Sequence, residues 1–414
     1  MEDERIFEPV ITSGSPQEIG AAFGRVNASS VQTHLREFME LCAREKLDDM
    51  QVVEKSHPGL QIVRTVAPWW EIEMDAIADA AGVAPDLYRA FCIGKYRRLF
   101  FGSAECTSYA ATGSYIPFSG TSFHKSRDNV SRLQCAFVRR IEDSTQQIYA
   151  WCGTSDTSDP TTMMFVNEQG LAGAADTGGR TDDFRGEGLM NTFGLRYVAE
   201  TCRDCHEAAD TLREWSDLGY YAGGNSKTNW MFSDTAGTIL RAVQGNHSIE
   251  AKFTTEGIVT NCERRLLEPT LLRQSGYLDA VALSEASRIK SVSMPSTISS
   301  MSADCVANDP QHLTCAWFGL GRPTRAPYLP LFVASRTVPR AMLDGSLYRR
   351  SFPSRATTAD LRKLERTWKT WVDDCLQQAH TLISAGHSND IADLTEQVTD
   401  ACVRDAFANM MGEA

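Results

Sequence analysis

The hydrophobic pattern of this 414-residue chain changes from helical to strand-like at Cys106. Over most of 14–105, apolar residues recur at three- and four-residue intervals, which is typical of amphipathic helices. After Cys106, short alternating segments are separated by Gly, Asp and Ser turns, which predicts strands. The first of these are 107–116, 135–141 and 148–152. The chain is therefore limited to a helical block followed by a sheet-rich region.

The remainder alternates between the two patterns. Residues 163–173 predict a hairpin with its turn at 168–170. We predict strands at 229–233, 238–243, 257–260 and 314–319, and helices at 192–218, 264–295 and 358–407. Central strands with helices before, between and after them indicate a layered α+β fold and not a βαβ array. No repeat or low-complexity linker divides the chain, so we expect one integrated domain.

Composition narrows the classes of protein to consider. An apolar content of 42% is enough for a large core, and a net charge of −12 without a basic stripe argues against nucleic acid as a partner. The acidic start Met1–Arg5 lacks the basic and apolar regions of a signal peptide, and no apolar run is long enough for a membrane span. Twelve scattered cysteines fit a reducing compartment. We expect a soluble, cytoplasmic protein without a membrane partner.

Cys106 is the strongest candidate for chemistry. Small residues precede it and two hydroxyl residues follow, which suits a thiol at the start of a strand. If the bond between Glu105 and Cys106 were cut, Cys106 would gain an α-amino group with a pKa of about 7.7–8.0, close to the roughly 8.5 of a thiol. The cut can be self-inflicted: Sγ attacks the Glu105 carbonyl, the acyl group passes from nitrogen to sulfur, and water hydrolyses the resulting thioester, which ends the covalent link to residues 1–105. The alternative is a buried structural thiol, the commoner fate of cysteine.

Several segments, in order, carry a resemblance to one family. They are Gly14-Ser15-Pro16-Gln17-Glu18-Ile19-Gly20 with Phe23-Gly24, Trp70-Glu71-Ile72-Glu73, Cys106-Thr107-Ser108, Asp128, Asn167-Glu168-Gln169-Gly170-Leu171-Ala172, Val259-Thr260-Asn261 and Leu320-Gly321-Arg322-Pro323. The whole chain resembles the self-processing N-terminal-nucleophile (Ntn) cysteine hydrolases of the acyl-CoA:6-aminopenicillanic acid (isopenicillin N) acyltransferase type. That family includes β-alanyl-amine hydrolases and is distantly related to choloylglycine hydrolases.

The resemblance implies a four-layer αββα sandwich of the Ntn-hydrolase type. Residues 1–105 would be a helical pro-segment that becomes the small chain, and residues 106–414 would form the core. The two cleaved chains would stay associated. A small-molecule amide or acyl donor and acceptor would be the other partners.

The resemblance also implies roles for three residues. Cys106 would be the nucleophile, and Asn261 would donate its side-chain amide to the oxyanion. Asp128 would hold the α-ammonium group or a neighbouring cation. The structural alternatives are a turn cap for Asp128 and a loop hydrogen bond for Asn261.

Three further residues are assigned to the substrate site. Lys125 stands where choloylglycine-type relatives place a catalytic Arg, and it would put positive charge beside the thiolate. Asp176 stands where the family has an Asn after the hairpin. Arg288 is similar to a substrate-site Arg of the choloylglycine relatives. As alternatives, Lys125 could be a solvated strand residue and Arg288 a surface helix residue.

The expected activity is that of an amidohydrolase or acyltransferase that cleaves or forms a small-molecule amide bond through an S-acyl-Cys106 intermediate. The alternatives are a dipeptidase-type peptidase and an unprocessed, non-catalytic binding member of the fold. We expect no metal and no cofactor, with an acyl-CoA as a candidate co-substrate.

One competing motif is Cys202-Arg203-Asp204-Cys205-His206, which fits the pattern for covalent c-type haem. Haem attachment takes place in an exported compartment, and the five residues fall inside the predicted helix at 192–218. A zinc site would need a second ligand pair, and the spacing of His247 and Cys262 does not indicate one. We therefore expect these cysteines to be structural.

Overall fold

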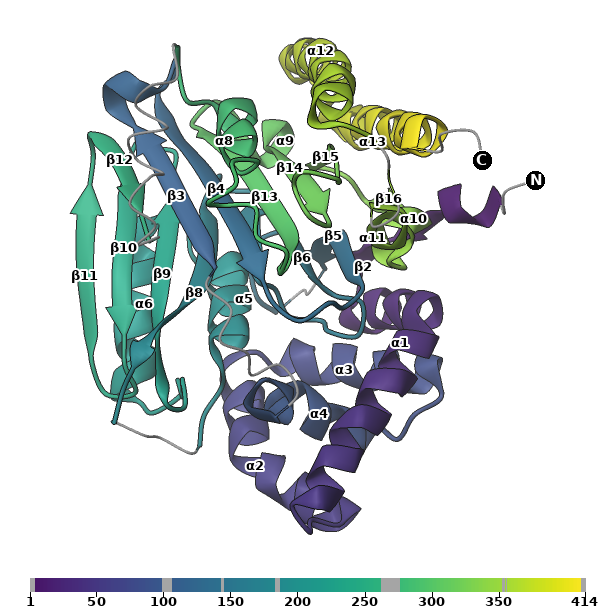
Figure 1. The fold of residues 1–414 in the computed structure, drawn as a ribbon, viewed down its shortest axis with the longest axis vertical. Helices are drawn as coiled ribbons and strands as arrows, with labels where there is room; N and C mark the ends of the chain where they lie inside the picture. The colour runs from purple at the N-terminus through teal and green to yellow at the C-terminus, as the bar shows by residue number, and fades with distance from the viewer. Residues whose placement is uncertain are drawn as a thin grey trace.

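A computed structural model describes residues 4–98, 106–142, 145–182, 187–261, 276–351, 354 and 356–410, with the backbone alone for 95–98. The predicted cleavage residue Glu105 lies outside these ranges. Two β-sheets stack face to face, with helices on both outer faces and a helical block at one end (Figure 1). The predicted α+β fold is confirmed, including its four layers.

The larger sheet has eight strands in the order β11-β10-β9-β8-β7-β6-β5-β2. All its neighbouring strands are antiparallel except the short pair β2 and β5. The strands are β2 (Ser13–Gly14), β5 (Gln134–Ile141), β6 (Trp151–Asp156), β7 (Met164–Asn167), β8 (Ala172–Arg180), β9 (Ser226–Ser233), β10 (Ile239–Gln244) and β11 (Ile249–Thr254). The predicted hairpin at 163–173 is β7 and β8, with its turn at the expected residues.

The smaller sheet has six strands, all antiparallel to their neighbours, in the order β12-β3-β4-β13-β14-β15. They are β3 (Thr107–Thr112), β4 (Gly120–Asp128), β12 (Gly257–Thr260), β13 (Thr297–Val306), β14 (Cys315–Leu320) and β15 (Tyr328–Phe332). A separate two-stranded sheet pairs β1 (Pro9–Ile11) with β16 (Thr337–Pro339). Strand β3 begins directly after Cys106, as predicted.

Helices cover the outer faces of both sheets (Figure 1). The larger sheet carries α5 (Asn191–Thr201) and α6 (Cys205–Asp217), and the smaller sheet carries α8 (Ala280–Ala286), α12 (Thr358–Ser384) and α13 (Ile391–Met410). The short helices are α9 (Pro310–Leu313), α10 (Arg340–Leu343) and α11 (Ser346–Ser351). None of the described helices is both long enough and apolar enough to cross a bilayer.

The N-terminal helices form the block at one end. They are α1 (Pro16–Arg44), α2 (Asp49–Val66), α3 (Pro68–Ala81) and α4 (Pro85–Arg98). Helix α1 begins with a capping box, in which the Ser15 hydroxyl accepts from the Glu18 N–H and the Glu18 carboxylate accepts from the Ser15 N–H. The capping box therefore fixes the residue at which the first helix begins.

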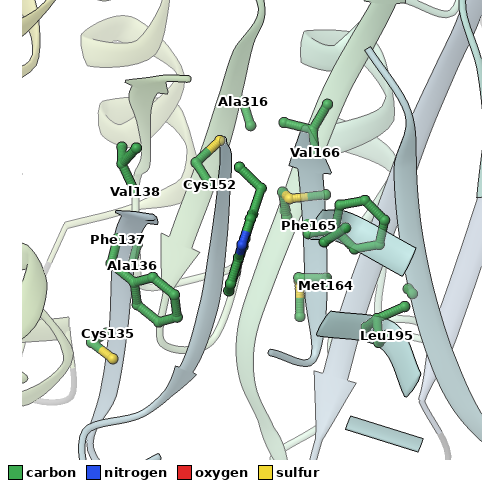
Figure 2. Packing of buried hydrophobic residues seen from close by; sticks show 14 of the residues in the cluster. Cys135, Ala136, Phe137, Val138, Cys152, Met164, Phe165, Val166, Leu195 and Ala316 are labelled. Atoms are coloured by element: carbon green, nitrogen blue, oxygen red, sulfur yellow. The ribbon is translucent and has the colours of Figure 1, made fainter. Parts of the chain in front are cut away.

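The core is continuous from the helical block into the sheets. Apolar side chains of β5, β6 and β7 pack together, with Ala316 of β14 and Leu195 of α5 among their neighbours in the same cluster (Figure 2). Cys135 and Cys152 are fully buried there and act as small apolar residues.

A buried cluster of charges ties the helical block to this core. Glu73 of α3 forms ion pairs with Arg139 of β5 and Arg196 of α5, and Arg196 also pairs with Glu200. The side chains of all four residues are no more than 1% exposed. Because an unpaired charge in such a place is costly, the two parts of the chain depend on each other for stability.

Three helix predictions need correction. The segment predicted as one helix at 358–407 is divided into α12 and α13, with a break at 385–390. The predicted helix at 192–218 is two helices, α5 and α6. Asp204 is the N-cap of α6, and its carboxylate accepts hydrogen bonds from the His206 and Glu207 N–H groups, so a new helix begins there. Cys202 and Cys205 are buried on either side of this break, and His206 stacks on Phe253. Of the helix predicted at 264–295, the structure shows the short α8, while 262–275 lie outside the described residues.

Candidate active site

Among the eleven cysteines that the structure describes, Cys106 is half-buried and the other ten are buried. Burial raises the pKa of several of those thiols, to about 11 in Cys202 and to about 12 in Cys305. A thiol with a raised pKa and no access to solvent is a poor nucleophile. Among the described cysteines, Cys106 is therefore the one placed to react.

Asp128 lies beside Cys106 through its main chain. The Sγ of Cys106 is 3.9 Å from the carbonyl oxygen of Asp128, the last residue of the adjacent strand β4. The Asp128 carboxylate accepts a hydrogen bond from the Thr297 hydroxyl of β13. The structure thus brings the predicted nucleophile and the predicted carboxylate to the same end of the smaller sheet.

Lys125 is buried between the two sheets and is not a solvated strand residue. Its ammonium group donates to the Ala175 carbonyl at 3.0 Å and forms an ion pair with Asp176 of β8, across the gap between the sheets. Burial lowers the pKa of Lys125, and the neighbouring Cys106 and Asp128 oppose that change. Lys125 therefore belongs to the surroundings of the thiol.

Asp176 completes this cross-sheet contact. Its Oδ1 also accepts a hydrogen bond of 3.0 Å from the Ser108 hydroxyl, and Ser108 is the register partner of Lys125 in the β3–β4 pair. Oδ2 of Asp176 is buried and has no hydrogen-bond donor among the described residues. The residue is only 2% exposed, so this oxygen is an acceptor kept from bulk water.

Asn261 follows β12, the strand that pairs with β3. Its main-chain N–H donates to the Ser108 carbonyl at 2.9 Å, two residues from Cys106. Both polar atoms of its side chain are buried and have no hydrogen-bond partner within the described ranges. Buried amides are normally hydrogen-bonded, and leaving one unpaired costs about 1–3 kcal/mol per group. An amide with this unused capacity is suited to a bound ligand.

Arg288 is not brought to this group. It is 6% exposed, and its contacts lie on the side of the smaller sheet that α12 covers. It pairs with Glu365 of α12 and with Glu285, and it donates to the Pro323 carbonyl at 2.9 Å. The arginine is neither a surface residue nor a neighbour of the thiol, and we leave it out of the proposed site.

Sequence analysis missed two hydroxyl residues that hold this site together. Ser108 anchors Asp176, and Thr297 anchors the Asp128 carboxylate. Ser108 lies in the Cys-Thr-Ser segment, so its closeness to Cys106 in the sequence could have identified it as a site residue. Thr297 is 169 residues from its partner, and nothing in the local pattern marks it.

A second buried pair lies on the same face of β4. Arg127 donates to both carboxylate oxygens of Asp156, and the Gln134 side chain donates to one of them. Burial alone would raise the pKa of Asp156, but the charge and hydrogen bonds of Arg127 and Gln134 bring it down to about 2. Both oxygens of Asp156 are therefore used, in contrast to Asp176. Within the described ranges, no group of His, Cys, Asp and Glu is arranged to hold a metal ion.

No protein-family profile and no curated protein matches this chain. Part of the chain is similar to solved structures. A penicillin V acylase from Agrobacterium tumefaciens is 16% identical with a TM-score of 0.38, over 55% of this chain and 86% of that one. An N-acylethanolamine-hydrolyzing acid amidase ortholog from Caenorhabditis elegans is 12% identical with a TM-score of 0.35, over 50% and 93%. A conjugated bile acid hydrolase from Clostridium perfringens is 13% identical with a TM-score of 0.35, over 56% and 95%. The reaction of this chain therefore has to be argued from its own residues.

Proposed function

We propose that this protein is a self-processing cysteine amidohydrolase of the N-terminal-nucleophile type, with Cys106 as its nucleophile. The observation that carries the proposal is the side chain of Asn261. This buried amide has no partner within the described residues, and it follows the strand that pairs with β3, which begins after the half-buried thiol of Cys106. Acyl transfer to a thiol requires a nucleophile and an amide donor for the oxyanion, and these two residues would supply them.

The proposed reaction follows from these positions. The Cys106 thiolate attacks the carbonyl carbon of an amide, and the negative charge that develops on the carbonyl oxygen is stabilised by the Asn261 amide. Collapse of the tetrahedral intermediate breaks the C–N bond, and the amine leaves with the proton that the α-amino group of Cys106 took from the thiol. The acyl group remains on Sγ. Asp128 holds the α-ammonium group of the processed Cys106 in place.

Self-processing would divide the chain at Glu105–Cys106. Residues 1–105 would then be a helical small chain and residues 106–414 a large chain, and the two would stay together as one structural domain. The buried ion pairs from Glu73 to Arg139 and Arg196 support a lasting association, because separation would expose or unpair these charges.

The acyl group on Cys106 passes to water in hydrolysis and to an amine in acyl transfer. The two outcomes are separated by supplying an acyl donor with and without a soluble amine and by quantifying the free acid and the new amide. A small-molecule amide is the proposed substrate, and an acyl-CoA is the alternative donor for transfer.

Intact mass spectrometry tests the proposal. The wild-type protein should give two fragments, 1–105 and 106–414, and the new N-terminus should be Cys106. Cys106→Ala should remain a single chain of 45.8 kDa. A wild-type chain that stays whole after long incubation would remove self-processing, and a Cys106→Ala chain that is still cut there would remove Cys106 from the mechanism.

A further inference from the structure

Asp176 uses one of its two carboxylate oxygens fully and the other not at all. Oδ1 receives the Lys125 ammonium group and the Ser108 hydroxyl. Oδ2 is buried and has no donor within the described ranges. An ionised carboxylate accepts about four hydrogen bonds, so this oxygen has unused capacity.

Asp176 lies at the end of the buried part of β8 and is linked to the surroundings of Cys106. Asp176 is the last buried residue of β8, since Thr177–Arg180 are exposed or half-buried. Its ion-pair partner Lys125 is a neighbour of Cys106. Lys125 therefore connects the carboxylate of Asp176 to the proposed nucleophile.

The charges that the structure describes near Cys106 limit what can bind there. Asp128 and Asp176 are acidic, Lys125 is basic, and Lys125 is paired with Asp176. Asp128 is the group that we propose for the α-ammonium of Cys106. A substrate that brings another carboxylate toward Oδ2 would be repelled, whereas an N–H donor would form a charge-assisted hydrogen bond.

We propose that Oδ2 of Asp176 receives an N–H group of the substrate, so that the preferred substrate is an amide with an amino group close to the scissile carbonyl. This inference rests on the proposed function, because it uses the same thiol and the same site. It narrows the substrate class from small amides in general to amino-bearing amides, and it makes Asp176 a specificity-determining residue.

Two matched thiol reagents test this without any turnover. The 2-aminoethyl and propyl methanethiosulfonates have nearly the same shape, but the first carries an ammonium group and the second a methyl group. In each case the Cys106 thiolate attacks the sulfenyl sulfur, a disulfide forms and methanesulfinate leaves. Modification of Cys106 is followed by peptide mass spectrometry, and each rate is divided by that reagent's rate with 2-mercaptoethanol.

In the wild-type protein, the corrected rate with the aminoethyl reagent should exceed that with the propyl reagent by roughly tenfold, the effect of one charge-assisted hydrogen bond. In Asp176→Asn, which keeps the shape and removes the charge, the ratio should fall to near one. Using a ratio within each variant cancels any change in the reactivity of the thiol itself.

Asp156→Asn is the matched control, because Asp156 is also buried and paired with a cation of β4 but has both oxygens satisfied. It should keep the wild-type ratio. A wild-type ratio of one or less overturns the proposal even if Asp176→Asn does not fold, and so does a high ratio that persists in folded Asp176→Asn. The modification rates do not depend on chain cleavage. A wild-type ratio of one would therefore overturn the role of Asp176 without affecting the proposed self-processing. A wild-type chain that stays uncut would still give valid ratios.

Discussion

At the scale of single residues, the environment of a thiol decides whether it can act. Ten of the described cysteines share the chemistry of Cys106 but are buried, and burial raises the pKa of most of them. Cys106 differs by position, since it stands just before a strand, with a lysine and a main-chain carbonyl beside it. The position of Cys106 at the start of β3 therefore distinguishes it from the other described thiols.

Asn261→Ala should lower kcat by a factor on the order of 10²–10³, because one oxyanion donor is removed. Stability to urea should change little, because the amide has no hydrogen bond to lose within the described residues. The assay is turnover of an amide substrate, together with urea unfolding.

The control for Asn261→Ala is Asn246→Ala. The Asn246 side chain accepts from the Gly223 N–H and donates to the Gly224 carbonyl, both at 2.8 Å. Its removal should lower the free energy of unfolding by about 1–3 kcal/mol. If Asn261→Ala is the less stable of the two variants, the Asn261 amide has a structural role and the oxyanion assignment is wrong.

Sequence motifs single out Cys106, Asp128 and Asn261 as candidates, because each stands at one end of a short segment with its own pattern. The pairing of Lys125 with Asp176 could not be predicted in the same way. The two residues are on different sheets, and their contact depends on how the sheets stack. The prediction for Arg288 failed in the opposite way. Its local sequence suggested a substrate-site or surface arginine, but the residue forms a buried ion pair with Glu365 of α12.

At the scale of elements, strand β4 shows why a pattern search can miss a central strand. Every residue of β4 is buried, and polar side chains point to both of its faces. Lys125 and Arg127 meet partners on the larger sheet, while His124 is hydrogen-bonded to Ser302 and Ser126 on the other face. A polar–apolar alternation is absent because both faces are buried and both are hydrogen-bonded.

Asp304 of β13 makes the contact between the smaller sheet and α8 depend on pH. Its Oδ1 accepts from the Ser122 hydroxyl at 2.6 Å and from the Ala280 N–H at the start of α8 at 2.8 Å. Burial raises its pKa to about 7, against about 3.9 in an unfolded chain. Between about pH 4 and pH 7, the folded protein thus keeps a proton that the unfolded chain has lost, and stability falls as pH rises.

Asp304→Asn should remove this dependence, because the amide oxygen can still accept both hydrogen bonds but does not titrate. Relative to wild type, the variant should gain on the order of 3 kcal/mol between pH 4 and pH 8. Urea unfolding across this range, in a Cys106→Ala background so that all chains are whole, gives the comparison. Parallel stability curves for the two proteins would show that the pKa of Asp304 is not raised in the fold.

At the scale of the whole molecule, the helical block is part of the core. The change of pattern at Cys106 predicted where helices give way to sheet, and the structure agrees. The pattern could not predict the depth of the contact, which depends on Glu73 meeting two arginines from β5 and α5. In the sequence, a charged residue of an amphipathic helix that will form a buried ion pair looks the same as one that will face solvent.

Glu73→Gln should lower the free energy of unfolding by about 3–5 kcal/mol, because it leaves Arg139 and Arg196 short of a buried counter-charge. Asp210→Asn, which breaks the exposed pair with Arg213, should cost less than about 1 kcal/mol. Thermal and urea unfolding measure both. Equal losses in the two variants would show that the buried cluster adds nothing to the attachment of the helical block.

Glu200 gives this attachment an optical reporter. The indole N–H groups of Trp69 and Trp70, from the helical block, donate to its carboxylate at 2.7 Å, and Trp151 of β6 donates at 3.3 Å. Three of the eight tryptophans thus meet at one acceptor that belongs to α5. Any loosening of the block from the sheets changes the surroundings of all three indoles at once, so tryptophan emission can follow the docking of the two parts in an unlabelled protein.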